Sequence, residues 1–147
     1  MTRHVHVVVP AILLAACQPA GDSAPSGPAT PTDDATPAAA PASLVGEYRV
    51  AGIDGAKVGG DIGIGLSITE TAIFYQPRCA GFDWTYSYEA GALTTERPAD
   101  TEVCAIGVHP EQQRLAEALD LVARVARTPS NGIELTGGGH SVTLFSQ

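Results

Sequence analysis

The sequence is short of positive charge. Its eight Lys and Arg residues are outnumbered by sixteen Asp and Glu residues, and the net charge at pH 7 is −8. A negative field of this size repels phosphate backbones, so we expect no nucleic acid partner. Long apolar runs are lacking as well: none follows the first 16 residues, so we expect no spanning helix there. The 147 residues have room for one domain with accessory segments.

Cysteines and aromatic residues are also scarce, and they are concentrated in one part of the chain. Only 5% of the residues are aromatic, and there are three cysteines and one tryptophan. Cys79 and Trp84 both lie in the stretch RCAGFDW at 78–84, and Cys104 ends the stretch EVC at 102–104. The remaining cysteine, Cys17, lies in an N-terminal segment with a different chemistry.

The first 17 residues read MTRHVHVVVPAILLAAC, a short basic start before an apolar run that is too short to span a bilayer. This layout is typical of a secretory leader, although Val7–Val9 alone would allow a buried strand. Leu14-Ala15-Ala16-Cys17 resembles the lipobox of bacterial lipoproteins. The resemblance implies that residues 1–16 are a lipoprotein signal peptide and that Cys17 becomes the lipidated N-terminus, a stable membrane anchor. Gln18 follows in place of an aspartate, which favours the outer membrane, with the domain in the periplasm.

The segment after Cys17 has the composition of a tether. Residues 18–43 contain six prolines among Ala, Ser, Thr, Gly and Asp, and no side chain more apolar than Ala or Pro. Such a segment cannot bury enough surface to offset the entropy cost of ordering it. We therefore expect the lipidated cysteine and a disordered tether over residues 17–43, followed by one domain over residues 44–147.

The domain reads as strands with a single helix. Ile62-x-Ile64-x-Leu66-x-Ile68 is the clearest alternation, which predicts a strand with one buried face. Apolar residues at three- and four-residue spacing predict a helix from Pro110 to about Ala126, ended by Pro129. Further strands are expected near 45–50, 72–75, 83–88, 92–95, 133–135 and 142–145. The fold class is therefore α+β: a curved antiparallel sheet, partly barrel-like, packed on one helix in the C-terminal half of the domain.

Cys79 and Cys104 form an even pair once Cys17 is set aside. In an exported protein the expected state of such a pair is a disulfide. Two alternatives remain open: a metal site that adds His109, His140 or Asp83, and a nucleophile formed by Cys104 with His109. The spacing lacks a CxxC element, and His109 stands at the predicted helix start, where capping is common. We expect no metal, no other cofactor and no catalytic residue.

Three aromatic residues alternate along the strand predicted at 83–88. Trp84, Tyr86 and Tyr88 should therefore share one face of the sheet. Such a stripe could line a groove for a hydrophobic ligand, or it could be the core face of the sheet. Both interpretations stay open from the sequence.

The order of these features resembles the META domain of HslJ-like bacterial lipoproteins. Cys79 lies where the family has Gly-Cys-Asn, and Cys104 where it has Thr-x-Met-Ala-Cys. The remaining matches are the opening Leu44–Tyr48, the helix residues Leu115 and Leu119, and the closing segments Gly132–Leu135 and Val142–Phe145. The resemblance implies an envelope protein linked to stress tolerance, with no established catalytic activity.

Together these observations predict a monomeric, non-enzymatic envelope lipoprotein that serves as a binding or stress-protection module. Its partner would be another envelope protein or a small ligand, and the lipid on Cys17 would hold it at the membrane. The alternative is an inhibitor of a periplasmic hydrolase, similar to a lysozyme or protease inhibitor. The acidic residues Glu96, Asp100 and Glu102 beside the cysteine pair would suit a basic target enzyme.

Overall fold

The computed structural model describes residues 39–59, 61–99 and 103–147. The chain divides into two units, Met1–Asp33 and Asp34–Gln147, and the helices and strands described here belong to the second. In this unit the strands are β1 (Gly46–Ile53), β2 (Ala56–Lys57), β3 (Gly65–Ile68), β4 (Ala72–Tyr75), β5 (Asp83–Glu89), β6 (Ala92–Glu96), β7 (Arg124–Arg127), β8 (Ile133–Gly137) and β9 (His140–Ser146). A short 3-10 turn, η1 (Arg78–Ala80), precedes β5, and the α-helix α1 (Pro110–Leu119) lies between β6 and β7.

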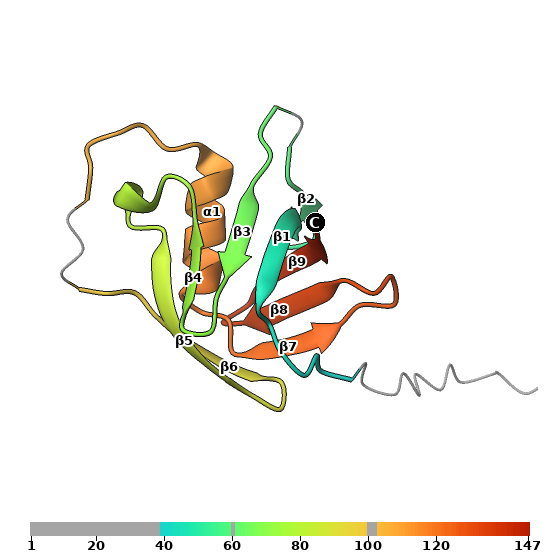
Figure 1. Cartoon of the computed structure of the whole chain (residues 1–147). Helices are drawn as coiled ribbons and strands as arrows, with labels where there is room; N and C mark the ends of the chain where they lie inside the picture. The colour runs from blue at the N-terminus through green and yellow to red at the C-terminus, as the bar shows by residue number, and fades with distance from the viewer. Residues whose placement is uncertain (1–38, 60, 100–102) are drawn as a thin grey trace, which may run out of the picture. The chain divides into compact units, whose positions relative to one another are not determined.

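The strands form an antiparallel barrel (Figure 1). Neighbours along the sheet are neighbours in sequence from β3 to β9, and β1 pairs with both β3 and β9. This last pairing closes an eight-stranded barrel, with β2 added beside β1. The expected antiparallel sheet with one helix is therefore present among the described residues, and the sheet is the larger part.

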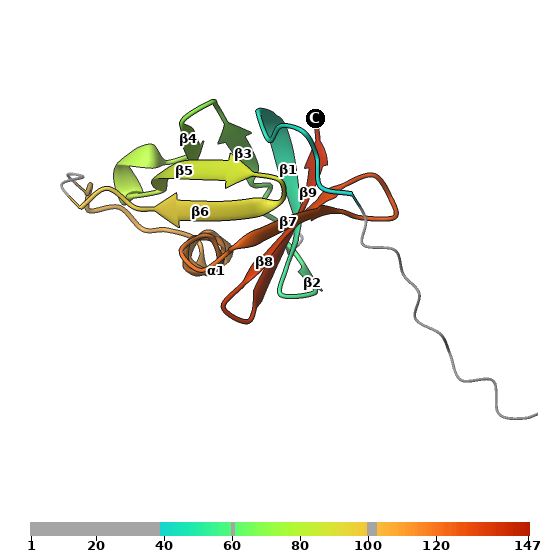
Figure 2. The ribbon, with the colours of Figure 1, turned by 90° about the horizontal axis from the view of Figure 1, so that it is seen from below.

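Alternation along the strands explains the core. Ile64, Leu66 and Ile68 are buried, as the alternating pattern predicted, although β3 begins only at Gly65 and Ile62 is partly exposed. Ile73 of β4 is buried as well. Helix α1 adds its buried side, which consists of Leu115, Ala116, Ala118 and Leu119. Figure 2 shows α1 nearly end-on beside β6, where the Thr95 hydroxyl donates a hydrogen bond to the Leu119 carbonyl at 2.6 Å. Strand and helix residues thus belong to one apolar cluster.

The predicted helix is too long at its C-terminal end. Helix α1 ends at Leu119, and residues 124–127 form β7. The apolar spacing of Val122 and Val125 fits a helix, but the same Val125 side chain is buried when β7 pairs with β8. Because β7 fills the gap between β6 and β8, pairing across the sheet outweighs the local helical pattern.

Gly137 marks the point where the end of β8 passes the link between α1 and β7. A Cβ atom at this position would stand 2.3 Å from the Leu121 carbonyl oxygen and 2.5 Å from the Ala123 nitrogen. Ala123 N–H also donates to the Thr136 carbonyl at 2.8 Å, which holds the two backbones together. Any side chain at residue 137 would push them apart, so glycine is required there. The turn between β8 and β9 follows directly at Gly138 and Gly139, both with positive φ.

The residues from 39 to 45, which precede β1, also contact the barrel. Pro41 and Leu44 are both buried. The Tyr88 hydroxyl donates a hydrogen bond to the Pro41 carbonyl, and the Tyr48 hydroxyl donates one to the Leu44 carbonyl. Ala40 also lies close to Gly91, so contacts with the barrel are already present ahead of the boundary expected at Leu44. Cys17 and most of the expected tether lie outside the described residues.

Candidate functional site

Cys79 and Cys104 are joined in the structure. Their Cα atoms lie 5.3 Å apart, within the range of disulfides, and their sequence separation is 25. The backbone N–H of Cys104 also donates to the carbonyl of Cys79 at 2.7 Å. The disulfide and this hydrogen bond attach η1 to the loop that precedes α1. Cys79 lies at the surface, on the side where the loop meets η1.

The other residues of the metal and nucleophile alternatives have separate partners. The ring of His109 caps α1, since its Nδ1 accepts a hydrogen bond from the Glu111 N–H at 3.2 Å. Asp83 accepts hydrogen bonds from the Arg78 guanidinium, and His140 contacts Asp54. Within residues 39–59, 61–99 and 103–147, no three His, Cys, Asp or Glu side chains gather closely enough to hold a metal ion.

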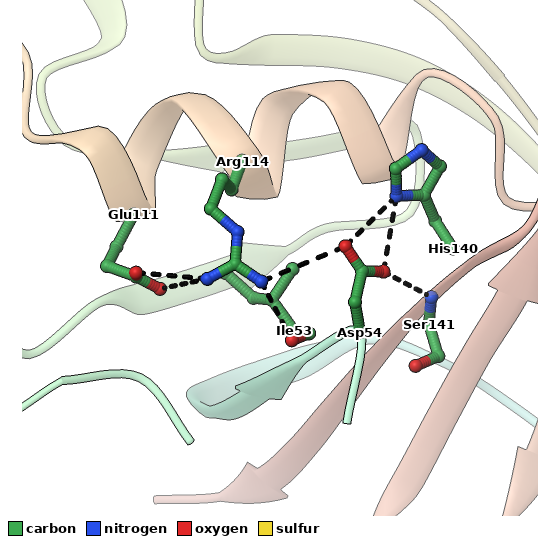
Figure 3. A network of polar contacts seen from close by, with 6 residues as sticks. All are labelled: Ile53, Asp54, Glu111, Arg114, His140 and Ser141. Carbon is green, nitrogen blue, oxygen red and sulfur yellow. Dashed lines mark hydrogen bonds and ion pairs between the residues drawn. The ribbon is translucent and has the colours of Figure 1, made fainter. Parts of the chain in front are cut away.

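A polar network fastens α1 to the β1–β2 turn and to the start of β9 (Figure 3). Asp54 accepts from the Ser141 N–H at 3.0 Å and contacts the His140 ring at 3.2 Å. The guanidinium of Arg114 donates to the Ile53 carbonyl at 3.1 Å and lies 3.8 Å from the Asp54 carboxylate. The Ser141 N–H, and after it His140 and Arg114, hold the pKa of Asp54 below its ordinary value. The network joins three segments of the chain and keeps the Asp54 carboxylate in its ionised form.

Trp84 belongs to the core and not to a ligand-facing surface. Its side chain is 0% exposed, and its indole N–H donates to the Asp120 carboxylate at 2.7 Å. The same carboxylate accepts a 2.7 Å hydrogen bond from Arg97, whose guanidinium lies 4.9 Å from the centre of the indole ring. Trp84, Asp120 and Arg97 thus connect β5, the end of α1 and the loop after β6.

Tyr86 and Tyr88 lie on the same side of β5 as Trp84, and both are partly buried against the core. The Tyr86 hydroxyl donates to the Thr69 carbonyl at 2.6 Å, and burial raises the pKa of this side chain. The Tyr88 hydroxyl donates a hydrogen bond to the Pro41 carbonyl. Trp84 therefore belongs to the core face of the sheet, whereas Tyr86 and Tyr88 also line a shallow hollow of about 280 Å³, so the three rings do not line one groove together.

A cleft of about 290 Å³ lies between α1 and the loops held by the disulfide. We call it the α1 cleft. Its apolar lining comes from η1 and the segment between η1 and β5, the loop ahead of α1 and the helix itself: Ala80, Phe82, Val108 and Ala116. Its polar lining comes from the segment after β6 and from one side of α1: Arg97, Gln113, Glu117 and Asp120. These residues come from four segments, and none of them is recognisable as a site residue from the sequence.

The disulfide-held loop ahead of α1 also carries exposed apolar side chains. Val103 is 61% exposed and Ile106 is 48% exposed. Val103 lies against Gly81, which directly precedes the cleft residue Phe82. Large apolar side chains that stay in water next to a cleft are typical of a surface that binds a partner.

A larger hollow of about 610 Å³ lies along β6 and β7, and it offers less chemistry. Most of its lining consists of alanine and glycine, with Arg124 as its one charged side chain. Binding sites need a few convergent polar groups beside their apolar surface. The α1 cleft has both and is also more enclosed, so we take it as the candidate site.

Comparison with family models, with curated proteins and with solved structures gives no match to this chain. The assignment of the site therefore depends on its geometry alone. In the described part of the chain, no helix has the length and apolar character needed to cross a membrane.

Proposed function

We propose that this chain is an outer-membrane lipoprotein whose periplasmic barrel is a non-enzymatic, META-like binding module. The α1 cleft is its partner-binding site. The observation that carries the proposal is the cleft itself, which is lined by both apolar and polar side chains and is bordered by the disulfide-held loop that exposes Val103 and Ile106. The disulfide between Cys79 and Cys104 supports it, because a fixed loop loses less conformational entropy when a partner binds.

The volume of the α1 cleft favours a protein partner over a small ligand. Pockets for drug-sized molecules occupy roughly 300–1,000 Å³, and this cleft is at the lower limit with about 290 Å³. Protein interfaces often depend on one anchor side chain that fills such a pocket, surrounded by weaker contacts. The exposed Val103 and Ile106 would supply contacts of that second kind.

Photo-crosslinking tests this function. With a photoreactive benzoylphenylalanine at Ala80, inside the α1 cleft, we expect a covalent adduct of one defined mass in intact cells. The matched control carries the same group at Ala56, an exposed position of β2 that does not line the cleft. Adducts that form equally well at both positions, or at neither, would contradict the proposed site.

The lipid anchor is a separate part of the proposal. The substitution Cys17→Ser removes the thiol that the lipobox-like motif would present for acylation, so we expect the protein to leave the membrane fraction or to remain an unprocessed precursor. Membrane fractionation and the mass of the intact chain measure this. A substituted protein that is still membrane-bound, with a mass that includes fatty acids, would rule out Cys17 as the anchor.

An inhibitor of a periplasmic hydrolase is the second candidate function. It is favoured by the loop ahead of α1, which presents Val103 and Ile106 to solvent while the disulfide holds it in place. Glu96 is exposed at the end of β6, whereas Asp100 and Glu102 lie outside the described residues. The identity of the protein cross-linked at Ala80 separates the two candidates, because an inhibitor would be found attached to a hydrolase.

A further inference from the structure

We infer that the α1 cleft receives a lysine or arginine side chain of a basic partner protein, with its cationic head bound by Glu117. This inference rests on the proposed function and specifies the chemistry of the anchor. It follows from three observations: which polar groups of the cleft already have partners, what lines the cleft, and what charge surrounds it.

The charged groups on the rim of the cleft are not equally available. Arg97 and Asp120 are paired with each other, and Asp120 also accepts from Trp84. Gln113 and Glu117 are exposed and stand four residues apart, on one side of α1. Neither of their side chains has a polar partner among residues 39–59, 61–99 and 103–147. The available groups are therefore a carboxylate and an amide.

Those two groups suit a cationic head. A carboxylate accepts charge-assisted hydrogen bonds from an ammonium or a guanidinium, and the amide oxygen of Gln113 can accept another. An anionic anchor would instead meet the carboxylates of Glu117 and Asp120. The cation in the lining is Arg97, whose Nε and one Nη already donate to Asp120 at 3.2 and 2.7 Å, so its charge is offset by that carboxylate. The rim therefore favours a positive charge.

The walls of the cleft suit the remainder of the same side chain. Ala80 and Val108 are partly exposed and provide apolar surface next to the polar rim, and Phe82, which is only 4% exposed, adds an edge. Lysine and arginine bury their methylene stems along such surface while the charged head stays at a polar edge. The net charge of −8 also draws basic proteins toward the chain before any contact forms.

Peptide probes test the anchor chemistry. The full mature chain, in detergent micelles, is titrated with acetyl-Ala-X-Ala-amide peptides in which X is lysine, arginine, norleucine or glutamate, and amide chemical shifts are followed by NMR. We expect the lysine and arginine peptides to bind about tenfold more tightly than the norleucine peptide, since a charge-assisted hydrogen bond is added. The shifts should concentrate at Gln113 and Glu117, and added salt should weaken binding.

A pair of charge-matched variants separates the cleft from the overall charge. Glu117→Gln should abolish the preference for the cationic peptides, whereas Glu89→Gln, at the far end of β5, should keep it. Equal binding of the norleucine peptide, or an equal loss in both variants, would overturn the inference. Failure of the peptides while the Ala80 cross-links persist would overturn only the anchor chemistry. Absence of those cross-links would overturn the proposed function.

Discussion

Replacing Trp84 by alanine is expected to lower the free energy of unfolding by about 3–5 kcal/mol. The indole is completely buried, and it stacks against Tyr75 with 5.8 Å between the ring centres. Its removal leaves a cavity inside the barrel and takes away the hydrogen bond to Asp120. Urea unfolding followed by circular dichroism measures the loss, because the variant no longer has a tryptophan to report by fluorescence.

A matched variant divides this effect into packing and hydrogen bonding. Trp84→Phe keeps an aromatic ring in the core but has no N–H to donate to Asp120. Its free energy of unfolding should therefore lie between those of the wild type and of Trp84→Ala. Asp120 keeps Arg97 as a partner in both variants. A loss below about 1 kcal/mol for Trp84→Ala would contradict the placement of this side chain in a close-packed core.

The strands could be predicted because their pattern is local. Ile64, Leu66 and Ile68 alternate in sequence and are buried in the barrel. The closing hairpin of β8 and β9 was also visible, since three glycines stand between two apolar runs. In both cases the residues that define the element are its own neighbours in the chain, so no information from distant segments is needed.

The closure of the barrel could not be predicted in this way. It depends on β1 and β9, where Val50 pairs with Leu144, and nothing in either segment specifies the other. The C-terminal end of α1 was missed for a related reason. Residues 124–127 satisfy both a helical and a strand pattern, and only the presence of β8 as a partner decides between them.

The candidate site was hidden because its residues look ordinary in sequence. Glu117 and Gln113 read as the solvent-facing side of a helix, and Arg97 reads as part of a polar loop. Their meaning depends on Phe82 and Val108, which the fold brings beside them from other segments. The cysteine pair was the available signal, since it marks the loop that forms one side of the cleft.

Loss of the bond between Cys79 and Cys104 is expected to lower the melting temperature by more than about 10 °C. For the sequence separation of 25 between the two cysteines, the chain-entropy model gives roughly 3 kcal/mol of stabilisation through restriction of the unfolded chain. In a domain of this size such a loss corresponds to a shift of more than about 10 °C. Thermal unfolding with and without reductant measures the shift, and a thiol titration of the unfolded, non-reduced mature chain should find no free thiol at either residue.

The variants make this result specific to one bond. Cys79→Ala should lower the melting temperature as much as reduction does, and adding Cys104→Ala should change it little, because the bond is already lost and the two effects cannot add. Reductant should leave the melting temperature of the double variant unchanged, since no disulfide remains in the domain. Two free thiols in the non-reduced wild type would show that the bond is absent. Cys104 would then be a free thiol five residues before the capping residue His109, and the metal and nucleophile alternatives would have to be tested again.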